Sequence, residues 1–197
     1  MVGQPSTSSN PNRAGLVTVG IDYALVNLGF CVHRDGEFDG RLLHEAKLRD
    51  SARLHQTRNW ILAQLEEVKP NLVAIENYSF GSLNRAFSLG EVGGVIREAV
   101  YSLGIPLIAV PPSSLKLFIT GRGLAKKKSV MRSLVERYGY ATSDDNIADA
   151  AGLARCAYVY LTNVSKYRSE LEVVQKLRQA AEKPMPTRRA RRNPKTI

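Results

Sequence analysis

Three short apolar runs dominate the first half of the chain. The segments "LVTVGID" (16–22), "NLVAIENY" (71–78) and "IPLIAV" (105–110) are apolar over most of their length. Continuous apolar runs of this length, bounded by turn residues, are typical of strands that are buried on both faces. The pattern therefore predicts three central strands.

Two further strands follow the first run. "GFCVHR" (29–34) and "RLLHEAKL" (41–48) flank "DGEFDG", which is rich in turn residues. Together with residues 16–22, these strands are expected to pair as an antiparallel meander.

Helical spacing of apolar residues appears after the meander. Asp50 or Ser51 could cap a helix that ends before residue 70, and Pro70 follows its end. Its predicted buried face consists of Leu54, Ile61, Leu65 and Val68. Further helices are predicted at 84–104, 113–119, 127–138, about 145–161, and 166–182, the last one amphipathic.

The order of elements sets the predicted fold class. Strands entered through crossover helices run parallel to the first strand, so residues 71–78 and 105–110 should add two parallel strands to the meander. The result is a mixed α/β sheet of five strands with helices on both faces.

Three glycines interrupt the helix predicted at 84–104. Gly90, Gly93 and Gly94 should each cost about 1 kcal/mol relative to alanine in a helix interior. Close approach of another backbone, from the sheet or from a second subunit, would offset that cost.

Charge and composition narrow the functional class. The 197 residues suit one domain, and 28 Lys and Arg against 18 Asp and Glu give a net charge of +10 and a pI near 9.8. Such an excess favours a polyanionic partner, with nucleic acid ahead of an anionic membrane. Residues 183–197 hold six basic residues and no acid. We expect this tail to be disordered and to act either as a phosphate-binding arm or as a solubilising end.

The remaining composition points to a cytoplasmic protein. Residues 1–14 are polar and are expected to be disordered, which leaves 15–182 as the folded domain. We expect no membrane span and no signal peptide, because no apolar run approaches about 18 residues. Cys31 and Cys156 have no metal-type spacing and are expected to be buried free thiols in a reducing compartment.

Acidic residues occur where the pattern calls for apolar ones. Asp22 and Glu76 close two central strands, and they would meet at the carboxyl end of the sheet if those strands are parallel neighbours. Asp145 and Asp149 lie four residues apart on one helix face. Clustered carboxylates raise each other's pKa unless cations compensate them, and an all-oxygen site suits Mg²⁺ or Mn²⁺. Two such ions about 3.5–4 Å apart could hydrolyse a phosphodiester.

Each acid also has an ordinary structural explanation. The acid after the first strand could cap a turn, Glu76 could pair with Arg85 or Arg97, and Asp144 and Asp145 could cap their helix.

Five segments, in order and with suitable spacing, resemble RuvC-like Holliday-junction resolvases, most closely the bacteriophage and actinobacterial relatives. The resemblance covers roughly residues 16–162. It implies an RNase H-like fold and a homodimer, in which each subunit nicks one of two opposed strands of a four-way junction and leaves 5′-phosphates. The segments are "VGIDYALVNLGFCV", "VAIENYSFG", "SLGEVGGVIREAV", "GIPLIAVPPSSLKLFITGRGLAKKKSVM" and "DDNIADAAGLARCAY".

The resemblance also implies site residues. The family's metal-binding acids correspond to Asp22, Glu76 and Asp149. A fourth ligand usually lies three residues before the last acid, where this chain has Asn146, and we favour the neighbouring Asp145 instead. A Pro-Gly pair that often follows the first acid is absent from "GIDYALVNLG", which alters the turn but keeps the acid.

DNA contacts are implied as well. Lys116 and Lys127 resemble the family's lysines near the scissile phosphate, where their charge would neutralise the transition state, and a solvated surface is their alternative explanation. An aromatic residue that stacks on an unpaired base resembles Tyr78 or Phe80, for which core packing is equally plausible. The further predicted DNA-binding residues are Arg122, Lys126 and Lys128.

Three rival functions remain beside the resolvase. A nuclease of the same fold acting on flaps, forks or structured RNA would use the same residues. A DNA-binding module with a degenerate site would explain Asn146. A sugar-kinase or actin-like ATPase also matches the first segment, but 197 residues cannot hold its two domains and a second phosphate loop is missing, so we expect no nucleotide cofactor.

Overall fold

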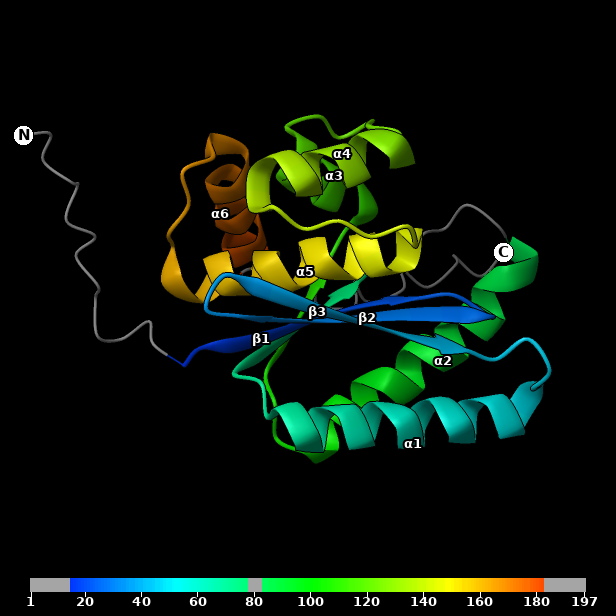
Figure 1. Cartoon of the computed structure of the whole chain (residues 1–197). Coiled ribbons are helices and arrows are strands. Elements are labelled where there is room, and N and C mark those ends of the chain that lie inside the picture. Colours follow the sequence, from blue (N-terminus) through cyan, green and yellow to red (C-terminus); the bar gives the residue numbers. More distant parts are fainter. Residues whose placement is uncertain (1–14, 78–82, 183–197) are drawn as a thin grey trace, which may run out of the picture.

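A five-stranded mixed sheet forms the centre of the molecule (Figure 1). The computed structural model describes residues 15–77 and 83–182, so the predictions for the two terminal segments lie outside the described residues. The strand order is β3-β2-β1-β4-β5. β1 pairs with β2, and β2 with β3, in antiparallel fashion, whereas β1–β4 and β4–β5 are parallel. The predicted architecture is therefore confirmed. The strands are β1 (Val17–Tyr23), β2 (Asn27–Arg34), β3 (Glu37–His44), β4 (Leu72–Glu76) and β5 (Leu107–Val110).

The third strand begins earlier than predicted. Asp35 and Gly36 alone form the turn, with φ angles of 52° and 93°, and β3 starts at Glu37 rather than at Arg41. Two-residue turns with positive φ at both positions match the twist of antiparallel strands, and Asp-Gly suits them. The second Asp-Gly pair lies within the strand instead, where Gly40 pairs with Cys31.

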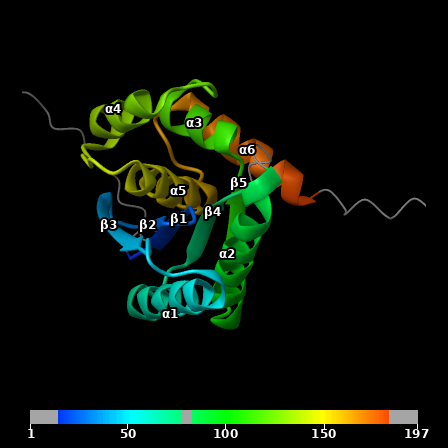
Figure 2. The same cartoon turned by 90° about the vertical axis from the view of Figure 1, so that its right-hand side faces the viewer.

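Helices cover both faces of the sheet (Figures 1 and 2). α1 (Asp50–Val68) and α2 (Leu83–Ser102) lie on one face, and α5 (Asp145–Thr162) lies on the other. The outer side of α5 is covered by α3 (Pro112–Thr120), α4 (Lys127–Tyr138) and α6 (Arg168–Glu182). No helix in the described ranges is both long and apolar enough to cross a bilayer.

The start of α1 differs from the prediction, whereas its buried face and end agree with it. Neither Asp50 nor Ser51 caps the helix, because Arg49 occupies the cap position and makes no capping hydrogen bond with its side chain. Ile61, Leu65 and Val68 are buried, and Leu54 packs against the same core. The helix ends at Lys69 in a left-handed conformation, directly before Pro70.

Two hydrophobic cores lie on opposite faces of the sheet. One contains Phe30, Ile61 and Ile96 between the sheet and α1 with α2. The other contains Phe118 and Leu153 and joins the sheet to the helices on the α5 side. Cys31 and Cys156 lie in this second core as buried free thiols, as predicted.

The α5 helix lies directly against the backbone of β1 and β2. A Cβ atom placed at Gly20 would lie 1.9 Å from the carbonyl oxygen of Ala150, and one at Gly29 would lie 2.2 Å from that of Asn146. The buried Thr18 hydroxyl donates a hydrogen bond of 2.8 Å to the carbonyl oxygen of Ala154. Small residues on both surfaces therefore set the distance between this helix and the sheet.

This contact predicts that Gly20→Ala lowers the free energy of unfolding by about 3 kcal/mol or more, because the new methyl group meets fixed backbone atoms. Chemical denaturation would measure the loss. Glu66→Ala, on the exposed side of α1, is the control and should change the free energy of unfolding by less than about 0.5 kcal/mol. Equal stability of the two variants would show that α5 can shift without cost.

Candidate active site

Two carboxyl groups meet where β1 and β4 end. Ile21 pairs with Ile75 in the parallel ladder, so the next residues, Asp22 and Glu76, lie side by side at the carboxyl end of the sheet. Asp22 is 8% exposed, and its side chain shares a hydrogen bond with that of Glu76. The strand order thus brings these two acids together as the sequence predicts.

A third carboxyl group, from Asp149, approaches them from α5. Burial raises the pKa of Asp22 well above its ordinary value, and the negative charges of Glu76 and Asp149 raise it further. Burial, and then the charge of Glu76, raise the pKa of Asp149 to about 6. Burial also raises the pKa of Glu76. The three acids therefore form one electrostatically coupled group, which we call the acid group.

Two lysines from the outer helices oppose this negative charge. Lys116 on α3 lowers the pKa values of Glu76 and Asp149. Lys127, the first residue of α4, lowers those of Asp22 and Asp149, and its ammonium forms an ion pair with the Asp145 carboxylate. The two lysines singled out in the sequence therefore both lie within electrostatic reach of the acids.

The polar residues Asp144, Asp145 and Asn146 at the start of α5 make different contacts. Asp144 is the helix cap, and its Oδ1 accepts hydrogen bonds from the backbone N–H groups of Asn146 (2.9 Å) and Ile147 (3.1 Å). The Asn146 amide donates to the same oxygen at 3.3 Å. Asn146 is thus engaged in the cap, whereas Asp145 contacts the lysine that faces the acid group.

The other predicted DNA-binding residues within the described ranges are surface cations. Arg122, Lys126 and Lys128 are exposed on or before α4. Neither Lys126 nor Lys128 is among the charges that shift the pKa values of the acid group. Tyr78 and Phe80 lie outside the described residues.

The acid group offers oxygen ligands to a metal ion by its chemistry. Within residues 15–77 and 83–182, no three or more His, Cys, Asp or Glu side chains are arranged so that they could hold a metal ion. Three buried carboxyl groups that raise each other's pKa are the electrostatic conflict that a divalent cation relieves. Carboxylate oxygens are also the ligands that Mg²⁺ and Mn²⁺ prefer. The residues therefore fit such an ion by their chemistry.

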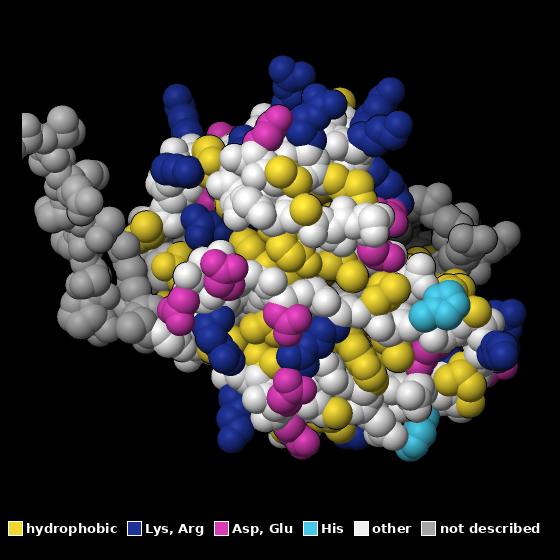
Figure 3. Space-filling model, viewed as in Figure 1, with side chains coloured by type: hydrophobic (Ala, Val, Ile, Leu, Met, Phe, Trp, Pro, Cys, Tyr) yellow, Lys and Arg dark blue, Asp and Glu magenta, His cyan; other side chains and the backbone are white. Residues whose placement is uncertain are grey.

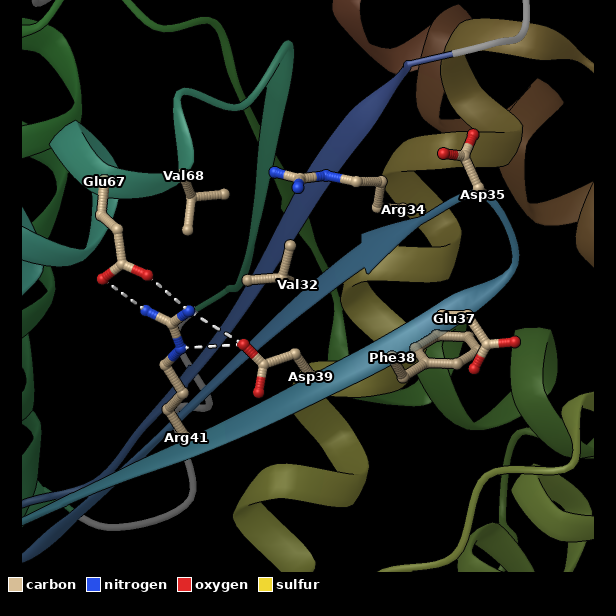
Figure 4. Close-up of a pocket in the computed structure, with 9 residues that line it drawn as sticks. All are labelled: Val32, Arg34, Asp35, Glu37, Phe38, Asp39, Arg41, Glu67 and Val68. Atoms are coloured by element: carbon tan, nitrogen blue, oxygen red, sulfur yellow. Dashed lines mark hydrogen bonds and ion pairs between the residues drawn. The ribbon is translucent and has the colours of Figure 1, made fainter.

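A separate hollow lies at the other end of these strands (Figure 4). Val32 and Arg34 line it, and they pair with Val19 and Val17, at the opposite end of β1 from Asp22. Arg41 bridges Asp39 and Glu67 there, with N–O distances of 2.9 Å to each. This network joins edge strand β3 to the last turn of α1, and none of the predicted site residues lines the hollow.

Comparison with known proteins identifies the family. The family model described as crossover junction endodeoxyribonuclease RuvC matches residues 18–157. The chain belongs to the RuvC family.

Bacterial RuvC proteins are similar over most of the chain. Crossover junction endodeoxyribonuclease RuvC of Chloroflexus aggregans is 31% identical, over 70% of this chain and 90% of the relative. The RuvC of Chlorobaculum parvum is also 31% identical, over 72% and 80%. The structure of Thermus thermophilus RuvC matches with a TM-score of 0.61 at 26% identity, covering 75% of this chain and 97% of that one. The structure of the same protein in complex with a Holliday junction substrate matches with a TM-score of 0.65 at 23% identity, which shows the shared fold.

The RuvC match spans the whole acid group and both lysines. The sequence did not predict the ion pair between Lys127 and Asp145, which requires the first turns of α4 and α5 to lie together. It did offer Asp144 as a helix cap, and the structure confirms that Asp144, rather than Asp145, has this role.

The raised pKa of Asp149 predicts an unusual pH dependence of stability. When folded, this carboxyl keeps its proton up to about pH 6, but when unfolded only up to about pH 4. Because the native state binds more protons in this window, the metal-free unfolding free energy should fall as pH rises from about 4 to 6, by up to about 3 kcal/mol. Asp22 and Glu76, whose pKa values are also raised, act in the same direction.

Chemical denaturation in chelator across this range would measure the slope. Asp149→Asn should flatten it, whereas Glu66→Gln, on the exposed side of α1, should leave it unchanged. A stability that rises over pH 4–6 in the wild type would contradict the coupling of the three acids.

Proposed function

We propose that this protein is a metal-dependent endonuclease that resolves four-way DNA junctions by paired nicks in opposed strands, leaving 5′-phosphates. The observation that carries the proposal is the convergence of Asp22, Glu76 and Asp149 with Lys116 and Lys127 in a member of the RuvC family. A RuvC structure bound to a Holliday junction supports branched DNA as the substrate. The net charge of +10 favours the same polyanionic partner.

In this proposal the acidic residues bind metal and the basic residues bind the DNA phosphate. Asp22, Glu76 and Asp149 would hold one or two Mg²⁺ ions, for which Mn²⁺ substitutes, with Asp145 as the fourth ligand once DNA or metal displaces its lysine. Bound there, the ions would supply an activated water and a stabilised leaving oxygen. Lys116 and Lys127 would bind the scissile phosphate and neutralise the charge that develops on it.

A homodimer is part of the proposal, and α2 supports it. Phe87 and Tyr101 are each 84% exposed, and they share one face of the helix with Gly90 and Gly94. A methyl group at Gly94 would meet no atom within 4 Å, whereas one at Gly93 would lie 2.7 Å from the Tyr23 hydroxyl. Gly93 therefore serves packing on the subunit's own sheet, and the exposed face around Phe87, Gly94 and Tyr101 would be the surface that a second α2 approaches. Two sites related by a two-fold axis would match the symmetry of a junction.

The first test is cleavage of a labelled mobile four-way junction in Mg²⁺ and in Mn²⁺. The wild type should nick opposed strands in pairs, and Asp22→Asn should lower the rate at least about a hundredfold. Asp145→Asn should reduce the rate more than Asn146→Ala, because Asn146 serves the helix cap. Arg41→Ala, in the distant hollow, is the control and should cleave at the wild-type rate.

Substrate comparison separates the rival functions. Equal cutting of flaps, forks or structured RNA would make the protein a broader nuclease of the same fold. Tight junction binding without cleavage in either metal would make it a binding protein.

Metal should also raise the thermal midpoint of the wild type and raise it less in Asp22→Asn. An equal rise of the thermal midpoint in both proteins would show that the metal does not bind at the acid group.

The dimer is tested by changing both exposed aromatics of α2. The double variant Phe87→Ser/Tyr101→Ser should weaken self-association at least about tenfold, because it removes two large apolar contacts. Sedimentation equilibrium would measure the dissociation constant, with Leu42→Ser on β3 (40% exposed) as the matched control. An unchanged constant would place the subunit interface elsewhere.

A further inference from the structure

One large apolar side chain is almost fully exposed on the cationic side of the molecule. Leu124, in the segment between α3 and α4, is 97% exposed, more than any other large hydrophobic residue in the described ranges. Single exposed apolar residues are common on protein surfaces, so exposure by itself assigns no role. The surroundings of Leu124 distinguish it.

The segment that carries Leu124 is held in a defined turn. The Ala125 N–H donates to the Arg122 carbonyl at 3.1 Å, which places Leu124 at a corner of the turn. The Arg122 N–H donates to the Thr120 hydroxyl at 3.0 Å. Before the turn, Gly121 ends α3 with a φ of 78°. The leucine therefore projects into solvent from a turn whose backbone is held by hydrogen bonds.

Leu124 also lines a groove with a cationic wall. The groove, of about 550 Å³, lies between this turn and α4. Its charged residues are Arg122, Lys126, Arg132 and Glu136, which leaves an excess of two positive charges. The three cations form no ion pair within the described part of the chain. Figure 3 shows that Lys and Arg side chains project from the α4 end of the molecule.

The groove adjoins the acid group through consecutive residues. Lys126 lines the groove, and Lys127 pairs with Asp145 and lowers the pKa values of Asp22 and Asp149. The cationic wall and Leu124 therefore lie next to the place where a phosphate would meet the acid group.

We propose that Leu124 is an apolar wedge that contacts an unstacked base at the branch point while Arg122, Lys126 and Arg132 hold the adjoining phosphates. The proposal rests on the proposed function and adds a residue that recognises the branch rather than cleaves it. Bases at a crossover have incomplete stacking, so an apolar side chain can cover a base face that is otherwise exposed to water. In a linear duplex every base face is already stacked, so the leucine gains nothing there.

The test uses the full chain in the Asp22→Asn background, which binds without cutting. A four-way junction carries 2-aminopurine at the branch point, and binding and fluorescence are followed together. Leu124→Ser should weaken junction binding about tenfold, leave linear duplex binding unchanged and abolish the fluorescence change on binding. Leu161→Ser, 41% exposed and about 24 Å along α5 from Asp145, is the matched control and should behave as the parent.

A second variant separates the phosphate contacts from the base contact. Arg132→Ala should weaken junction and duplex binding alike and lower the salt dependence of both by about one counterion. The thermal midpoint of Leu124→Ser should equal that of the parent, because the side chain makes few contacts.

Three outcomes would overturn the wedge in distinguishable ways. If the parent binds junctions and Leu124→Ser matches it in affinity and fluorescence, the wedge is wrong and the proposed function stands. If the parent does not bind junctions at all, the proposed function fails and the wedge falls with it. Weakened binding to junction and duplex in equal measure would make Leu124 a general contact and also contradict branch recognition.

Discussion

The contact between α5 and the backbone of β1 and β2 is the constraint on which the rest of the structure depends. Gly20 and Gly29 leave room for the carbonyl oxygens of the helix, and Thr18 fixes the two elements by a buried hydrogen bond. Only at this distance can a carboxyl group on the helix, that of Asp149, interact with carboxyl groups at the ends of two strands. A larger residue at either glycine would separate the acids as well as the helix.

The same contact makes the site electrostatically unfavourable by itself. Packing that dense leaves little water around Asp22 and Asp149, and burial is the largest cause of their raised pKa values. The metal-free protein therefore gives up stability at neutral pH in order to hold these carboxyls together. Such a conflict is typical of functional sites, where a ligand supplies the compensation that the chain does not.

The positive charges that partly offset the acid group come from the outer layer of helices. Lys116 and Lys127 belong to α3 and α4, which lie outside α5 and reach the acids from there. The scaffold thus places the acids on the rigid sheet and its closest helix, and the cations on the outer helices. The face of the sheet covered by α1 and α2 carries none of these charges.

The sequence by itself determined the strand directions, the approximate helix positions and the two acids that close β1 and β4. Hydrophobic periodicity is a local property, and the crossover rule leaves few possible topologies. The place of β4 beside β1 came from the tertiary structure. The sequence did not determine that β3 begins at Glu37, since two Asp-Gly pairs competed for one turn. Nor did it show the ion pair between Lys127 and Asp145 or the exposure of Leu124 beside a cationic groove. These features depend on how α4 packs against α5. That packing joins residues distant in the sequence, so local sequence patterns do not predict it.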